Sequence, residues 1–174
     1  MAEIVVADTG PLIALSRIGR IDLLGRVFER AVVPRVVFDE TQFHSDRADA
    51  RAIFSGLELG LFVVDETPVQ PQAFPDGDKR GPGETAAIAL AASHGYGVLI
   101  DEKLGRSVAS AIGLRVIGTV GVLVIARKLG YVPALNRCCN YLHHLATTFQ
   151  WGCLKARFET QASNASSGSS LARS

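Results

Sequence analysis

The chain has 174 residues and a mass of 18.5 kDa, with 48% apolar and 20% charged residues. This composition is typical of one globular domain and excludes an intrinsically disordered chain. Eighteen Lys and Arg face seventeen Asp and Glu, for a formal charge of +1. Binding of nucleic acid through bulk positive charge is therefore excluded, and any such contact must be a local patch.

The chain opens with an alternation of short β-branched runs and helical patterns. Residues 3–7 form a predicted buried strand, which ends at the turn Asp8-Thr9-Gly10-Pro11. A capping residue followed by Pro predicts that a helix begins there and continues to Ile18. A second helix is expected at 21–28, and the next strand and helix are expected at 31–33 and 34–40.

The middle of the chain continues the same alternation. The sequence predicts a helix at 44–59 and a strand at 61–64. The segment 65–83 holds four of the seven prolines and is expected to be the main loop. An Ala-rich helix follows at 83–94, and a strand is predicted at 97–100.

The last part of the pattern predicts three further helices, at 103–112, 119–129 and 133–146. It also predicts one strand, at 114–117. Strands that alternate with helices in this way predict an α/β domain with a mainly parallel sheet of five strands and helices on both faces.

Four acidic residues stand at the ends of predicted elements: Asp8, Glu40, Glu84 and Asp101. Asp8 and Asp101 follow predicted strands, and open parallel sheets place their sites outside the carboxyl ends of strands. Each acid also has a plain structural alternative. Asp8 and Asp101 could cap the helices that follow them, and Glu40 and Glu84 could be ordinary helical residues.

Gathered at one edge of a sheet, these acids would form a metal site. Clustered carboxylates repel one another unless a cation neutralises them. Ligation by oxygen alone, without His or Cys, favours Mg²⁺ or Mn²⁺ over zinc. Such a site suits phosphodiester hydrolysis, in which the metal activates water and stabilises charge on the phosphate.

The sequence resembles the PIN-domain proteins, and in particular a PIN-like subfamily described as predicted nucleic-acid-binding proteins. The matching stretches, in chain order, are VVADTGPLIAL (5–15), VPRVVFDE (33–40), GETAAIALA (83–91), LIDEKLGR (99–106) and GLRVIGT (113–119). Together they span about residues 4–146. The chain departs from many PIN nucleases at Gly10, where these have Ser, and at Glu84, where these have Asp.

The resemblance implies a three-layer α/β/α fold and a metal-dependent ribonuclease that uses Mg²⁺ or Mn²⁺. The family's acidic quartet falls on Asp8, Glu40, Glu84 and Asp101, as catalytic and metal-binding residues. RNA is the implied substrate. Many relatives are toxins held inactive by a small antitoxin protein, and many are dimers.

Three further residues are candidates for contact with the substrate: Thr9, Lys103 and Arg106. Arg106 lies five residues after Asp101 on the next predicted helix, where its guanidinium could grip a backbone phosphate. Its alternative role is a structural ion pair with one of the acids. The alternative function for the whole chain is a catalytically silent nucleic-acid-binding or regulatory module with the same fold.

The predicted organisation is a PIN-like domain over 1–148, an extension over 149–161 and a disordered tail over 162–174. The tail is rich in Ser and Ala and has almost nothing to bury. Apolar residues on several faces of the helices between 122 and 145 favour a homodimer. Three cysteines without a C-x-x-C spacing, and no long apolar run, favour a reducing cytoplasm and no membrane.

Overall fold

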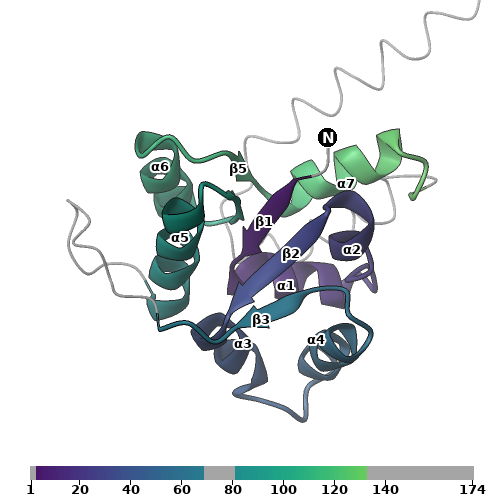
Figure 1. Cartoon of the computed structure of the whole chain (residues 1–174). Helices are drawn as coiled ribbons and strands as arrows, with labels where there is room; N and C mark the ends of the chain where they lie inside the picture. The colour runs from purple at the N-terminus through teal and green to yellow at the C-terminus, as the bar shows by residue number, and fades with distance from the viewer. Residues whose placement is uncertain (1–2, 69–80, 133–174) are drawn as a thin grey trace, which may run out of the picture. The chain divides into compact units, whose positions relative to one another are not determined.

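The computed structural model describes residues 3–68 and 81–132, and Figure 1 shows how their elements are arranged. The strands within these ranges are β1 (Ile4–Ala7), β2 (Arg30–Pro34), β3 (Val63–Asp65), β4 (Gly97–Leu99) and β5 (Val116–Ile117). The helices are α1 (Thr9–Arg17), α2 (Leu23–Val27), α3 (Arg35–Gln42), α4 (Ala48–Glu58), α5 (Pro82–His94), α6 (Lys103–Ala111) and α7 (Thr119–Lys128).

The five strands form one sheet in the order β3-β2-β1-β4-β5, and every neighbouring pair is parallel. The register of the central strand places Val5 beside Ala31 of β2 and Val6 beside Val98 of β4. Because two strands lie on each side of it, β1 is the middle strand of the sheet. This arrangement confirms the predicted α/β class with a parallel sheet.

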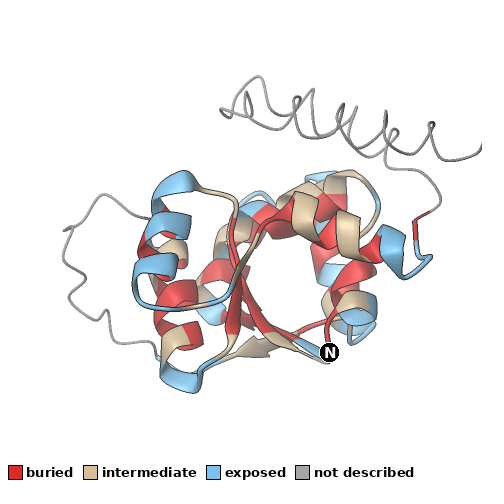
Figure 2. Ribbon diagram, turned by 90° about the horizontal axis from the view of Figure 1, so that it is seen from above, coloured by how far each residue is buried: buried red, intermediate tan, exposed pale blue. Residues whose placement is uncertain are grey.

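Helices cover both faces of the sheet, as Figures 1 and 2 show. The helices α5 and α6 pack on one face, while α1, α2 and α7 pack together on the other. Val5, Val6, Val98 and Leu99 are completely buried because the central strands are covered from both sides. The result is the predicted three-layer α/β/α fold.

Several element boundaries differ from prediction: the helix expected from 21 begins at Leu23, and the strand expected from 114 begins at Val116. Two further differences have a local cause in the backbone. The helix expected from His44 begins at Ala48, since Arg47 is extended backbone at its N-cap position. The strand expected from Leu61 begins at Val63. Gly60 adopts a left-handed conformation with φ 70°, and the N–H of Leu61 donates to the carbonyl of Gly56, so this stretch still closes the end of α4.

Several predictions fall outside the described residues: most of the loop at 65–83, the helix at 133–146, the extension at 149–161 and the tail at 162–174. In the described part of the chain, every helix is too short or too polar to cross a bilayer.

Candidate active site

The strand order reverses direction between β1 and β4, and the two acids predicted to follow strands lie there. The backbone N–H of Asp8 donates to the carbonyl of Leu99 at 3.0 Å, which extends the pairing of the two strands. Asp101 comes two residues after Leu99. Ligands of open parallel sheets bind at such a reversal, outside the carboxyl ends of the strands.

Asp8 is a buried carboxyl group, with 6% of the residue exposed. It occupies the N-cap position of α1, but its side chain makes no capping hydrogen bond. Burial raises its pKa to about 7; the backbone amide of Thr9 opposes this rise, and the negative charges of Glu84 and Glu40 add to it. Asp8 is therefore a strained acid beside two others rather than a plain helix cap.

Glu40, on α3, is held between two other helices. Its Oε2 accepts a hydrogen bond from the Thr9 hydroxyl at 2.6 Å, and its Oε1 accepts one from the Gly83 N–H at 2.9 Å. A Cβ on Gly83 would collide with this carboxylate. A glycine at the start of α5 therefore lets the helix backbone approach Glu40, which ties α1, α3 and α5 together at the site.

Glu84 stands in the first turn of α5, where the helix dipole favours a carboxylate. Its side chain reaches the backbone of α6, because a Cβ built on Gly105 would lie 2.6 Å from Glu84 Oε1. Gly105 thus leaves space for the Glu84 carboxylate, as Gly83 does for the Glu40 carboxylate. The first-turn position predicted from the sequence is compatible with a site role, because the charge of Glu84 acts on Asp8.

Asp101 is held by the residue that opens α7. The backbone N–H and the hydroxyl of Thr119 donate to its Oδ1 and Oδ2, at 2.8 and 2.6 Å. Burial raises the pKa of Asp101, while these two hydrogen bonds and the charge of Arg106 work in the opposite direction. A Cβ built on Gly118 would lie 3.0 Å from Asp101 Oδ1 and 3.1 Å from Arg106 Nη1, so both side chains reach this glycine.

The four acids thus fall into two neighbouring sets. In the first set, the negative charges of Glu84 and Glu40 raise the pKa of Asp8. In the second, Asp101 accepts hydrogen bonds from Thr119, and the positive charge of Arg106 acts to lower its pKa. Within residues 3–68 and 81–132, no three acidic, His or Cys side chains converge closely enough to form a ready-made metal centre. The arrangement provides oxygen donors at one edge of the sheet, two of them already oriented by hydrogen bonds.

The three predicted substrate contacts occupy different positions. The Thr9 hydroxyl is bound to Glu40, so it orients that acid. Lys103 and Arg106 are exposed on α6. Sequence reasoning assigned no role to Thr119, which is fully buried. Its position two residues after the last strand places it at the strand ends, but nothing in the local sequence pairs it with Asp101.

Replacing Thr119 by Val is expected to destabilise the metal-free protein at pH 8 by about 1–3 kcal/mol, because a buried carboxylate loses a donor. The cost should shrink as the pH falls toward the raised pKa of Asp101, since the protonated acid needs that donor less. Urea unfolding in EDTA at several pH values measures this. Thr119→Ser keeps the hydroxyl and should show a cost that does not depend on pH. Equal stability of Thr119→Val and wild type at pH 8 would contradict the role.

A family model described as PIN domain matches residues 4–151. A search of the curated proteins found no match to the chain. The family match covers most of the chain and includes all four acids, and it agrees with the parallel sheet and its two helical layers. The chain therefore belongs to the PIN domain family.

Proposed function

We propose that this protein is a divalent-metal-dependent endoribonuclease whose site is built from Asp8, Glu40, Glu84 and Asp101. One observation carries the proposal. A carboxyl group buried at the point where the strand order reverses has its pKa raised to about 7, by burial first and then also by two neighbouring acids. A buried acid that ionises only against its burial and two neighbouring negative charges, at the expected position of a site, favours binding of a cation.

The donors fit a hard divalent cation by type. All four are carboxylates, and Mg²⁺ and Mn²⁺ prefer oxygen ligands. An ionised carboxylate has about four acceptor positions, so Glu40 and Asp101 keep acceptor capacity beside their present hydrogen bonds. Since no three acids converge in the described residues, binding requires the side chains of Asp8 and Glu84 to move toward a common point. When bound, the cation neutralises charge on the phosphate and activates water.

The protein's own residues prepare this site in separate ways. Thr9 and Gly83 hold the carboxylate of Glu40, and Thr119 holds that of Asp101. Two of the acids are thereby oriented before anything binds, which lowers the cost of assembling the site. Asp8 holds a proton below about pH 7 in the metal-free protein and must release it to act as a ligand.

Arg106 is proposed to bind a phosphate of the RNA. Arg106→Ala should weaken RNA binding several-fold and reduce the slope of log affinity against log salt by about one. The guanidinium is exposed, so stability should change by less than about 0.5 kcal/mol. The matched control is Arg127→Ala, another exposed Arg, in the last turn of α7, away from the edge where that helix begins.

Fluorescence anisotropy with labelled RNA at several salt concentrations measures both variants. If Arg106→Ala unfolds, or if it loses no more affinity than Arg127→Ala, Arg106 serves Asp101 structurally and the substrate role is wrong.

A second candidate, the catalytically silent nucleic-acid-binding module, is favoured by the same hydrogen bonds. Glu40 and Asp101 each use both carboxylate oxygens within the protein, and the described acids do not converge. Cleavage of unstructured RNA with Mn²⁺ and with EDTA separates the two candidates. A small antitoxin and a homodimer stay predictions.

A further inference from the structure

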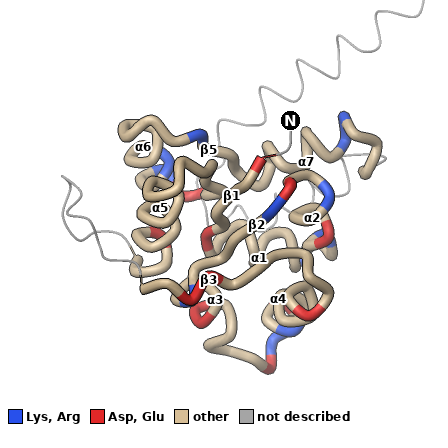
Figure 3. The backbone as a smooth tube through the Cα atoms, in the orientation of Figure 1, with Lys and Arg blue, Asp and Glu red and all other residues tan. Residues whose placement is uncertain are grey.

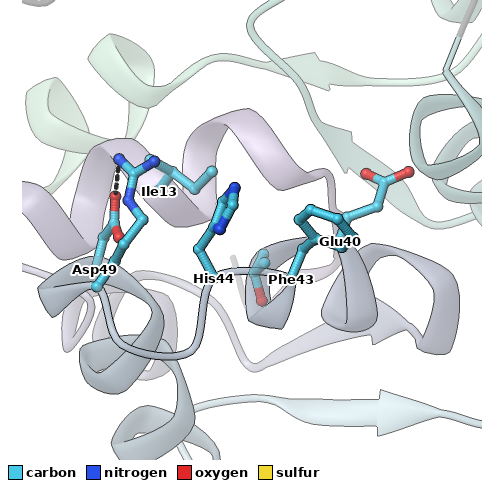
Figure 4. Close-up of a pocket in the computed structure, with 7 residues that line it drawn as sticks. Ile13, Glu40, Phe43, His44 and Asp49 are labelled. Carbon is cyan, nitrogen blue, oxygen red and sulfur yellow. Dashed lines mark hydrogen bonds and ion pairs between the residues drawn. The ribbon is translucent and has the colours of Figure 1, made fainter.

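A pocket of about 340 Å³ lies beside the acids, on the side of Glu40 (Figure 4). It is formed by α1, by the end of α3 and by the turn that leads into α4. Its lining residues are Ile13, Glu40, Thr41, Phe43, His44, Arg47 and Asp49. Figure 4 shows Glu40 and Asp49 at opposite ends, with Phe43 and His44 between them. Glu40 belongs to both, so the pocket lies next to the candidate active site, and Figure 4 shows the Glu40 carboxylate directed away from the rings of Phe43 and His44.

The walls of the pocket are fixed by polar contacts between helices. Arg17 of α1 forms an ion pair with Asp49 of α4 at 2.8 Å. The side chain of Gln42 donates to the carbonyl of Ala50 at 3.2 Å, which joins α3 to α4. A pocket with its walls tied in this way is formed before any ligand arrives, as small-molecule sites usually are.

Phe43 is unusually exposed for an aromatic side chain that lines a pocket. It is 82% exposed, so the protein's own core does not account for it. Its ring meets the imidazole of His44 edge-to-face, with centroids 4.9 Å apart and an interplanar angle of 80°. This contact orients the Phe43 ring while leaving most of its surface open to solvent. An exposed and oriented aromatic face is a platform on which a nucleobase can stack.

Arg47 supplies a positive charge at the opposite end from Glu40. It contacts Asp49 at 3.2 Å with half of its side chain exposed. Partial burial disfavours the charged form of Asp49, but the hydrogen bond and charge of Arg17, with the charge of Arg47, hold its pKa below the ordinary value. Arg17 lies closer to the Asp49 carboxylate, at 2.8 Å, than Arg47 does, at 3.2 Å. The exposed pair of Arg47 is weak, so its guanidinium can turn to a phosphate at little cost.

We propose that this pocket binds one nucleotide of a single-stranded RNA, with its base stacked on Phe43 and a phosphate held by Arg47. The proposal rests on the proposed function and adds where the substrate is gripped. The acids at the sheet edge repel RNA, so affinity must come from groups beside them. Arg106 lies on the β5 side of the acids and the pocket lies on the β2 side, so one strand can cross the acids between them.

Size and chemistry favour a nucleotide over an apolar peptide side chain. The volume is at the lower end of the range for small-molecule sites. The lining combines an aromatic face, an imidazole and a guanidinium with two carboxylates. Figure 3 shows that the basic positions of the described residues are spread over several elements, among them α2, α4, α6 and α7.

The test is binding of a labelled, unstructured RNA to the full chain in EDTA, where metal-dependent cleavage does not occur. Phe43→Ala should weaken binding about tenfold or more, because stacking of a base on an aromatic ring is lost. Phe43→Trp should bind as well as wild type or better. The matched control is Phe54→Ala, which removes an exposed Phe of α4 that does not line the pocket and should leave affinity unchanged.

An RNA with abasic sites separates stacking from a structural effect. Wild type should bind the abasic RNA more weakly than intact RNA, and Phe43→Ala should show a much smaller difference between the two RNAs. Arg47→Gln should weaken both RNAs equally and lower the salt dependence, as loss of a phosphate contact does.

Three outcomes would overturn the proposal. If wild type binds or cleaves RNA and Phe43→Ala does so equally well, the pocket has no part in binding while the proposed function stands. If wild type neither binds nor cleaves RNA, both fail. If light scattering shows a wild-type dimer that Phe43→Ala converts to a monomer, with RNA affinity unchanged, Phe43 belongs to an interface between copies of the chain.

Discussion

Replacing Asp8 by Asn is expected to stabilise the metal-free protein above neutral pH. In the folded state, burial and then the charges of Glu84 and Glu40 act to raise the pKa of Asp8 to about 7, from 3.8 for a free side chain. A difference of this size destabilises the charged form by roughly 4 kcal/mol. Asn cannot ionise, so Asp8→Asn should be more stable than wild type at pH 8 by about 1–4 kcal/mol, which is several degrees in Tm.

The sign of the pH dependence follows from proton binding. Between pH 3.8 and about 7 the folded state binds more protons at Asp8 than the unfolded state does. Stability from this group is therefore present at low pH and is lost as the pH rises through about 7. Urea unfolding in EDTA from pH 4 to 9 should show this loss in wild type and a flatter profile in Asp8→Asn.

The control is Asp46→Asn, at an exposed position in the turn before α4, which should follow the wild-type profile. A plain helix cap predicts equal stability of Asp8→Asn and wild type at pH 8, because Asn caps a helix about as well as Asp. Equal stability, or a loss of stability in Asp8→Asn, would contradict the account of a strained acid.

A divalent cation is expected to stabilise wild type more than it stabilises the two Asn variants. If Mn²⁺ binds the folded protein only, a concentration about a hundredfold above its dissociation constant stabilises wild type by about 2.7 kcal/mol. Asp8→Asn and Asp101→Asn should lose most of this gain, because each removes an anionic ligand. The gain should also decrease below pH 7, where the proton on Asp8 competes with the metal.

Thermal melting of the three proteins with and without Mn²⁺ provides the measurement. Asp39→Asn is the control, since Asp39 is exposed and pairs with Arg35 on the surface of α3. If Asp8→Asn and Asp101→Asn keep the full Mn²⁺ gain, the cation binds elsewhere.

Much of the fold was predictable because its signals are local. The β-branched runs around Val5 and Val98 are continuous rather than alternating, as expected of strands buried on both faces. The turn at Asp8 carries a helix start in its own residues. The boundaries that were missed depend on backbone conformation at single residues, such as the left-handed Gly60, which lets the end of α4 extend to Leu61.

The candidate site was predictable in its acids but not in their partners. The placement of Asp8 and Asp101 follows from strand ends in a parallel sheet. The partners are set by packing between helices distant in sequence: Thr119 reaches Asp101 across 18 positions, and Gly83 reaches Glu40 across 43. No local pattern encodes such contacts. The pocket at Phe43 was missed for the same reason, since its walls come from three separate helices.

The most direct test is cleavage of an unstructured, end-labelled RNA by wild type and Asp8→Asn, each in Mn²⁺ and in EDTA. The account predicts cleavage by wild type in Mn²⁺, none in EDTA, and a rate at least about a hundredfold lower for Asp8→Asn, equivalent to about 2.7 kcal/mol of lost transition-state stabilisation. Cleavage that persists in EDTA or in purified Asp8→Asn at the wild-type rate would contradict it, as would binding of RNA by wild type without any cleavage in Mn²⁺.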